Sequence, residues 1–193
     1  MRSNRKPVHY AVKVLLLITL LGAVSCAGEP PAVVEEEQSF ITIEGPGVES
    51  TVQLSLEELQ SMTGDLVEDD YFSINTYGTE EYFHFKGVWV WAILDKKVDL
   101  KEEATAVSFI AEDGYTVTYT LDEVRREDYI DQNNPDKKYK MILAWEENHQ
   151  AYDPAEGNPF RLVNGQREPG DVNKPLWVSQ VKTLKVECRE DLQ

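Results

Sequence analysis

The sequence predicts an α+β domain with a mixed β-sheet core and short helices at its edges. Short runs of alternating, β-branched or aromatic residues recur along the chain, and turns rich in glycine, proline, asparagine or aspartate separate them. Only three brief segments suggest helices, so strand patterns dominate. Residues 39–193 suffice for one domain with its own hydrophobic core, and they contain no internal repeat.

The first half of this domain is expected to hold strands and two short helices. Phe40–Glu44 alternates in polarity and stops at a Gly-Pro-Gly turn, which is typical of a strand. Ser55 and Glu58 form a capping box, which predicts a short helix at that point. The compact apolar segment Val88–Leu94 follows Gly87 and is expected to be a short buried helix. The other expected strands of this half are 52–54, 71–77 and 81–85.

The second half is expected to begin with a β-hairpin. Glu112-Asp113-Gly114 is a strong turn signal between two strand patterns, 106–111 and 115–120. A short helix is expected over 121–127, and the polar run 132–136 is typical of an exposed loop. Further strands are expected over 140–145 and 177–186.

Residues 1–25 are typical of a secretory leader. Basic residues precede an apolar run, Val14–Val24, that is shorter than the roughly 20 apolar residues needed to span a bilayer. The run ends in Ala-Val-Ser-Cys26, which resembles the bacterial lipobox, although alanine stands where leucine is usual. We therefore expect Cys26 to carry a lipid that anchors the protein to a membrane outside the cytoplasm, in the periplasm or on the cell surface. A plain secretory leader with an incidental Cys26 is the alternative.

The segment after the leader is strongly acidic. Residues 26–38 contain two prolines and four acidic residues, and they are expected to be a tether. The whole chain has a net charge of −16, and the leader holds four of its 19 basic residues and none of its 35 acidic ones. Such a surface repels phosphate backbones, so no nucleic-acid partner is expected. Cys188 is the other cysteine of the chain and is expected to be structural or incidental.

Most standard catalytic spacings are absent from the sequence. It has no Walker loop and no GxGxxG, HExxH, CxxC or GxSxG motif. His84 lies in an alternating segment and is expected to be partly buried and hydrogen-bonded, whereas His149 lies in a polar turn and is expected to be solvated. Two histidines so far apart in sequence form a metal site only if the fold brings carboxylates to them, so no metal site is predicted.

Arg161 follows a Gly-Asn-Pro turn and enters an apolar run that is typical of a strand. Burying a guanidinium is costly unless it meets an anion or a carboxylate. In so acidic a chain an internal carboxylate is the favoured partner, and a bound anion is the alternative.

Five segments carry a family resemblance when they are taken in order. They are Val52–Leu59, Gly87–Leu94, Ala111–Tyr115, then Leu143–Trp145 with Asn148 and Gly157–Val163, and finally Trp177–Val178 with Leu184–Val186. They resemble the strand and S-L-E-E-L helix, the G-V-x-L-x-x-L-L segment, the A-x-D-G-Y turn, the L-A-x…N-G…G-x-P-L-R-L-V stretch and the closing strand of the sulfite-oxidase-type, molybdopterin-binding oxidoreductase domain. The resemblance covers about residues 50–187 and implies the sulfite-oxidase-like fold.

The chemistry of that family matches less well. In its catalytic members a cysteine thiolate holds molybdenum on the strand before the G-V-x-L segment; here Asn75 stands near that place, and no cysteine lies between Cys26 and Cys188. A neutral amide cannot replace a thiolate as a soft ligand. The family's V-x-P-G is altered in Val163–Gln166, and its V-K-W, whose lysine lies by the pterin, is altered in Val178–Gln180. These departures from the family's pattern indicate a relative without molybdenum and without the family's pterin contacts.

Three functions are open to such a chain, and whether it is an enzyme is left undecided. In the leading hypothesis the old cofactor cleft holds no cofactor and binds a small ligand or an envelope protein, with Arg161 as the group that binds an anion. The residues expected at its rim are Asn75, Tyr77, His84, Asp113, Tyr115, Asn158 and Arg161. The second hypothesis is a molybdopterin-dependent oxidoreductase that holds its cofactor without the cysteine. The third is an envelope redox protein that binds haem or a metal through His84 or His149.

Overall fold

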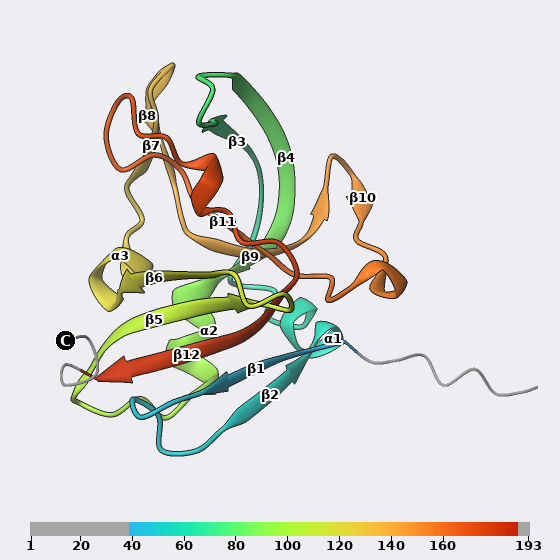
Figure 1. Ribbon diagram of the computed structural model, residues 1–193, viewed down its shortest axis with the longest axis vertical. Coiled ribbons are helices and arrows are strands. Elements are labelled where there is room, and N and C mark those ends of the chain that lie inside the picture. Colours follow the sequence, from blue (N-terminus) through green and yellow to red (C-terminus); the bar gives the residue numbers. More distant parts are fainter. Residues whose placement is uncertain (1–38, 189–193) are drawn as a thin grey trace, which may run out of the picture. The chain divides into compact units, whose positions relative to one another are not determined.

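The structure, a computed structural model, describes residues 39–188 (Figure 1). The expected leader, the lipidated Cys26 and the tether lie outside these residues. The described chain forms two five-stranded sheets, a two-stranded hairpin and a few short helices, which confirms the predicted α+β class. None of the helices within 39–188 is long and apolar enough to cross a membrane.

The first sheet is mixed and has the strand order β2-β1-β12-β5-β6. Its strands are β1 (Phe40–Glu44), β2 (Val52–Ser55), β5 (Ala104–Ala111), β6 (Thr116–Thr120) and β12 (Val181–Cys188). β1 runs parallel to β12, and the other neighbours are antiparallel. The first and the last strand of the described chain therefore lie side by side in this sheet (Figure 1).

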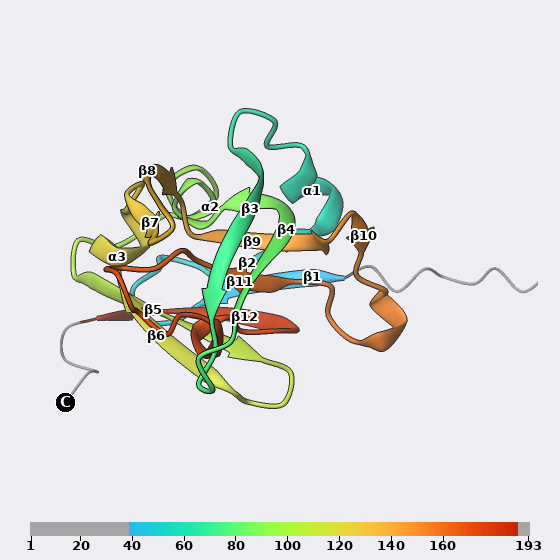
Figure 2. The ribbon, with the colours of Figure 1, turned by 90° about the horizontal axis from the view of Figure 1, so that it is seen from above.

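The second sheet has the order β10-β9-β4-β3, and β9 also pairs with β11. Its strands are β3 (Leu66–Ile74), β4 (Glu80–Trp89), β9 (Ile142–Glu147), β10 (Gln150–Ala151) and β11 (Arg161–Val163). β3 and β4 form a long hairpin that runs across the direction of the strands of the first sheet (Figure 1; Figure 2). Gly87 lets β9 approach β4 closely, because a Cβ on this residue would lie 2.3 Å from the Leu143 carbonyl oxygen.

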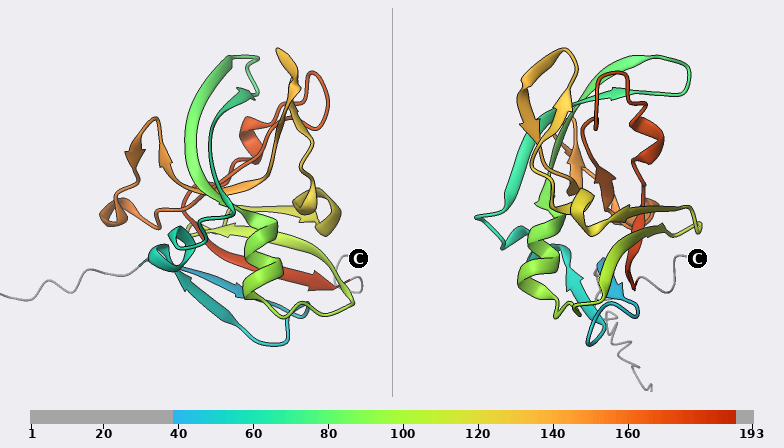
Figure 3. Two further views of the ribbon diagram at one scale, coloured as in Figure 1. Left: turned by 180° about the vertical axis from the view of Figure 1, so that it is seen from behind. Right: turned by 90° about the vertical axis from the view of Figure 1, so that its left-hand side faces the viewer.

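Two of the three α-helices begin with a complete capping box. The helices are α1 (Leu56–Gln60), α2 (Val90–Lys97) and α3 (Leu121–Arg125), with 3₁₀ turns at η1 (Pro154–Glu156) and η2 (Lys174–Leu176). Ser55 caps α1 and Thr120 caps α3, and in each box the glutamate three residues later accepts a hydrogen bond from the cap N–H. α2 lies behind the first sheet as this sheet is seen in Figure 1, and the left view of Figure 3 shows its position.

The exposed loop predicted over 132–136 is right at 132–133, which form a turn, and wrong at 134–136, which are exposed but belong to a strand. Residues in this region form a hairpin of β7 (Tyr129–Asp131) and β8 (Asn134–Tyr139). Tyr129 and Tyr139 pair across it and are both buried, and the Tyr139 ring lies 4.8 Å from that of Tyr71. Burial of these aromatic rings holds the two strands together, so the turn is confined to Gln132 and Asn133 and the chain is extended from Asn134.

Two other boundaries differ from the sequence-based expectation. The expected helix over 88–94 begins only at Val90, because Trp89 still pairs with β9. The expected strand over 177–186 begins only at Val181, because Gln180 has a left-handed φ of 51° that interrupts an extended chain.

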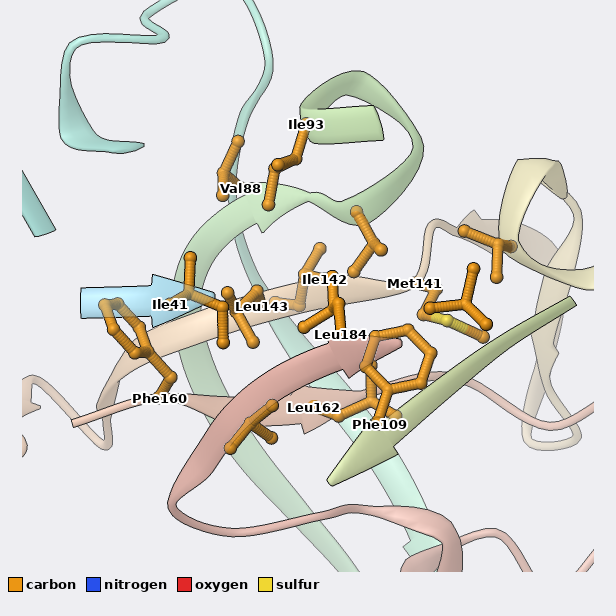
Figure 4. Close-up of a cluster of buried hydrophobic side chains, with 14 of the residues drawn as sticks. Ile41, Val88, Ile93, Phe109, Met141, Ile142, Leu143, Phe160, Leu162 and Leu184 are labelled. Atoms are coloured by element: carbon orange, nitrogen blue, oxygen red, sulfur yellow. The ribbon is translucent and has the colours of Figure 1, made fainter. Parts of the chain in front are cut away.

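The hydrophobic core lies between the two sheets and α2 (Figure 4). Ile41, Phe109 and Leu184 from the first sheet meet Leu143 and Leu162 from the second, and all are fully buried. Since these side chains come from strands between β1 and β12, the described domain supplies its own core.

Candidate functional site

A small cavity lies beside the start of β11 and has a volume of about 200 Å³. Its lining residues come from the segments around η1, β11 and the turn before β12. They are Tyr152, Asp153, Glu156, Gly157, Asn158, Phe160, Arg161, Ser179 and Gln180. Ligand pockets for drug-sized molecules usually have volumes of about 300–1,000 Å³, so this cavity suits a smaller molecule.

Arg161 is the cationic group of this cavity, and Glu147 is its ion-pair partner. Arg161 Nη1 donates to Glu147 Oε2 at 2.6 Å, and both side chains are about one-fifth exposed (23% and 20%). β9 and β11 bring them together, because Arg161 pairs with Ala144 and Glu147 ends the same strand. The predicted internal carboxylate partner is therefore confirmed. The buried Nε of Arg161 has no hydrogen-bond partner among the described residues.

Tyr152 completes this group from the segment after β10. Its hydroxyl donates to the same Glu147 oxygen at 2.6 Å, and its backbone N–H donates to the Trp145 carbonyl at 3.0 Å. Burial raises the pKa of the Tyr152 hydroxyl, and the hydrogen bond to Glu147 adds to this rise. The hydroxyl thus stays protonated and available as a donor. No signal in the sequence distinguishes Glu147 or Tyr152 from other polar turn residues.

Asn158 lies in the lining but uses its side chain to join three segments. Its Nδ2 donates to the Val181 carbonyl at 2.8 Å and to the Phe40 carbonyl at 3.1 Å. Its backbone N–H donates to Glu112 Oε1 at 3.1 Å. These bonds make Asn158 a structural part of the rim, and they separate the cavity from a wider hollow of about 610 Å³ in which Asn158 also takes part.

Asn75 and Tyr77 lie away from this cavity, in the turn between β3 and β4. Asn75 Oδ1 accepts the backbone N–H groups of Tyr77 and Thr79, each at 2.9 Å. This Asx-type arrangement ends β3 at Ile74, earlier than predicted. Tyr77 is 92% exposed.

Asp113 and Tyr115 lie in the turn between β5 and β6. Asp113 Oδ1 accepts the Tyr115 N–H at 2.9 Å, and the Tyr115 hydroxyl donates to the Pro175 carbonyl at 2.8 Å. Of the seven residues predicted for one rim, the cavity lining therefore unites Asn158 and Arg161. It does not include Asn75, Tyr77, His84, Asp113 or Tyr115.

His84 lies on β4 and belongs to a separate polar cluster. Its Nδ1 lies 2.8 Å from Asp70 Oδ1, its Nε2 lies 3.5 Å from Glu68 Oε1, and its ring centroid lies 4.1 Å from that of His149. The hydrogen bond to Asp70 raises the pKa of His84; burial opposes this rise, and Glu68 adds to it. As predicted, His84 is partly buried and hydrogen-bonded.

A buried amide network fills the region next to the Asn75 turn. Asn173 accepts the Ile74 N–H at 2.9 Å and donates to the carbonyls of Phe72 and Asn164. Asn164 also accepts bonds from Trp177 Nε1 and from the Tyr119 hydroxyl. Buried amides that are already satisfied within the protein leave little demand for a polar ligand at this place.

Molybdopterin, which the resemblance implies, does not fit the residues present. Asn75 Oδ1 already accepts two backbone hydrogen bonds within its own turn. In addition, a neutral amide is a poor ligand for high-valent molybdenum. In the segment that resembles the family's V-K-W, Ser179 stands at the place of the pterin lysine, and the next residue, Gln180, is also uncharged and donates to the Glu156 carbonyl at 2.7 Å. The described domain thus offers neither the thiolate nor the cation at those two places.

Comparisons with known proteins support the fold and leave the chemistry open. No family model matches this chain, and no curated protein matches it. Among solved structures, it is similar to the sulfane dehydrogenase SoxCD from Paracoccus pantotrophus, with a TM-score of 0.55 and 18% sequence identity. The likeness covers 79% of this chain and 39% of that one, so this chain spans well under half of its structural neighbour. At this identity the likeness shows the fold alone, and the chain has the sulfite-oxidase-like α+β fold that its sequence predicts.

Proposed function

We propose that this chain is an extracytoplasmic lipoprotein, anchored through Cys26, whose domain has kept the sulfite-oxidase-like fold as a binding module without molybdenum. The basic and apolar leader with its lipobox-like end supports the location. The acidic composition supports an exposed position in the cell envelope rather than contact with nucleic acid.

The proposal that the domain holds no molybdenum rests on the position and the hydrogen bonds of Asn75. This residue replaces the cysteine of catalytic relatives, and its side chain holds the turn after β3 together. A replacement thiolate for molybdenum would have to come from elsewhere in the domain, but residues 39–187 contain no cysteine.

The cavity beside Arg161 is the proposed ligand site. Arg161 belongs to the run that resembles the family's R-L-V, and Ser179 and Gln180 belong to the segment that resembles its pterin-contacting strand. The cavity is therefore a reduced remnant of the cofactor cleft. Its buried, unpartnered Arg161 Nε favours a ligand with an acceptor oxygen, because an unsatisfied buried donor costs about 1–3 kcal/mol.

The charges around the cavity argue against a multiply charged anion as the ligand. Glu147 already neutralises Arg161, and Asp153 and Glu156 add two carboxylates to the rim. Repulsion by these carboxylates increases with the charge of the ligand. A small carboxylate carries a single charge and can be bound by the guanidinium through one or two hydrogen bonds.

Two measurements test the two parts separately. Molybdenum and pterin analysis of the protein purified from its native host should find no stoichiometric cofactor; a full equivalent of molybdenum would overturn the cofactor-free part. For the ligand, sodium acetate and sodium sulfate are titrated into ¹⁵N-labelled protein. Acetate should shift the Arg161 Nε–H resonance and neighbouring amides, and sulfate should shift them less.

The matched variants are Arg161→Lys at the cavity and Arg125→Lys on α3. The first should abolish the acetate-dependent shifts, and the second should leave them unchanged. Equal responses of both variants, or no response of the cavity resonances in the unaltered protein, would contradict the ligand site while leaving the molybdenum analysis to stand by itself.

A further inference from the structure

The polar cluster around His84 has the composition of a transition-metal site. His84 on β4, His149 in the turn between β9 and β10, and Glu68 on β3 each offer a ligand atom, and these three atoms all lie within 4.8 Å of one another. His84 is partly buried, and the other two are exposed. Imidazole nitrogens with one carboxylate oxygen are ligands that suit Zn²⁺ and its first-row neighbours.

The strand register places Glu68 beside His84. Glu68 pairs with Lys86 and Asp70 pairs with His84, so all four side chains lie on the same face of the β3–β4 hairpin. Lys86 forms an ion pair with only one oxygen of Glu68, Oε2, at 3.3 Å. The other oxygen, Oε1, faces His84 Nε2.

The turn after β9 holds His149 over His84. Asn148 donates its backbone N–H to the His84 carbonyl at 2.7 Å, and its Oδ1 accepts the His84 N–H at 3.1 Å. Asn148 and His149 both have a positive φ, 50° and 63°, which is the conformation of a tight two-residue hairpin turn. The turn is thus fixed to the same residue whose ring it covers.

Asp70 selects the nitrogen of His84 that remains for a metal. Its Oδ1 lies 2.8 Å from Nδ1, so the ring donates its Nδ1 proton to this carboxylate and presents Nε2 toward Glu68. A carboxylate behind a ligand histidine is the usual outer-shell arrangement of zinc sites. With metal–ligand bonds of about 2.0–2.2 Å, tetrahedral ligand atoms lie roughly 3.3 Å apart. The 3.5 Å between His84 Nε2 and Glu68 Oε1 is already close to this spacing.

We propose that Glu68, His84 and His149 bind one divalent transition-metal ion, of which Zn²⁺ is the test case, with Asp70 as the positioning residue of His84. The exposed side chains of Glu68 and His149 close the remaining distance by rotation. Three protein ligands leave a fourth position of a tetrahedral ion for water or for a donor atom of a partner.

This site is independent of the proposed ligand cavity. Phe85 is the β4 residue that pairs with Glu147, the partner of Arg161, and His84 precedes it in the strand. Consecutive strand residues point to opposite faces, so the metal site and the cavity lie on different faces of β4. Failure of one proposal therefore does not imply failure of the other.

The test uses untagged chain from residue 27 onward, in which His84 and His149 are the two histidines. Zn²⁺ affinity is measured by competition with a chromophoric chelator. The expected result is one Zn²⁺ per chain, with strong loss of affinity in His84→Gln and in His149→Gln and a weakening of about 10–100-fold in Asp70→Asn. Asp69→Asn is the matched control: Asp69 pairs with Phe85 and is bound by Lys137, so Zn²⁺ affinity should not change.

A structural readout accompanies the affinities. Long-range ¹H–¹⁵N spectra of the imidazoles should show Zn²⁺ on His84 Nε2, and circular dichroism should show that the surface variants remain folded. Equal Zn²⁺ affinity in the unaltered protein and in both histidine variants would overturn the site. Displacement of Zn²⁺ by an equal concentration of Mg²⁺ would also overturn it, because that order of affinity belongs to carboxylates without imidazole.

Discussion

The rings of His84 and His149 stack with their centroids 4.1 Å apart and their planes inclined by 36°. His84 comes from β4 and His149 from the turn between β9 and β10, and the contact exists because Asn148 is hydrogen-bonded to both the backbone N–H and the backbone carbonyl of His84. A hairpin turn thus converts two isolated histidines into neighbours, and the register of β3 adds the carboxylates of Glu68 and Asp70.

Replacing Gly87 by alanine should destabilise the domain strongly. The new Cβ would lie 2.3 Å from the Leu143 carbonyl oxygen and 2.6 Å from the Ala144 Cα, both backbone atoms that cannot move aside without separating β4 from β9. We expect a loss of at least about 1–3 kcal/mol in the free energy of unfolding, measured with urea. Gly64→Ala is the control, because a Cβ there meets nothing within 4 Å, and a similar loss in both variants would contradict this reason.

Replacing Asn173 by alanine should be among the more damaging substitutions near the β3–β4 hairpin. The change leaves the Ile74 N–H and the Phe72 carbonyl without this partner in a buried region, whereas the Asn164 carbonyl keeps its bond from Trp177 Nε1. Each unsatisfied buried group costs about 1–3 kcal/mol, so we expect a total loss of several kcal/mol in urea unfolding. A loss below about 1 kcal/mol would mean that water replaces the amide.

Ser55→Ala should lower the free energy of unfolding by about 0.5–2 kcal/mol at neutral pH, because it removes the side-chain cap of α1. Thr51→Ala, on an exposed residue just before β2, is the control and should have little effect. Equal losses in the two variants would exclude the cap as the cause.

The same capping box should depend on pH through Glu58. Its hydrogen bond from the Ser55 N–H, followed by that from the Ser55 hydroxyl, lowers the pKa of Glu58. A carboxyl with a lowered folded pKa stabilises the protein above its unfolded pKa of about 4.3 and loses this effect as the pH falls through the folded value. The difference in stability between the unaltered protein and Glu58→Gln should therefore shrink on acidification through this range, as measured by urea unfolding; a difference that stays constant would contradict the assignment.

Tyr152→Phe should weaken the ion pair at the cavity without breaking it. The change removes the hydroxyl that donates to Glu147 Oε2 at 2.6 Å and leaves Arg161 Nη1 as the donor to this oxygen. We expect a loss of about 0.5–1.5 kcal/mol in urea unfolding. Tyr77→Phe is the matched control, since Tyr77 is almost fully exposed, and its stability should equal that of the unaltered protein.

Local sequence signals predicted most of the strands and the capped helices. The Ser55 box fixes the start of α1 because both of its hydrogen bonds lie within four consecutive residues. The Asp113-Gly114 turn likewise fixes the hairpin of β5 and β6, since its geometry depends on the turn residues themselves. The loop predicted over 132–136 extends too far, into β8, because the burial of Tyr129 and Tyr139 is a non-local effect.

The sequence by itself determined the fold class, the need of Arg161 for a carboxylate or an anion and the absence of a cysteine from residues 39–187. Only the tertiary structure decided that Glu147 is that carboxylate, that Asn75 and Arg161 line different regions, and that His149 covers His84. The physical reason is the range of the interactions. Caps and turns depend on residues a few positions apart, whereas strand register and the close approach of β9 to β4 depend on packing of the whole core.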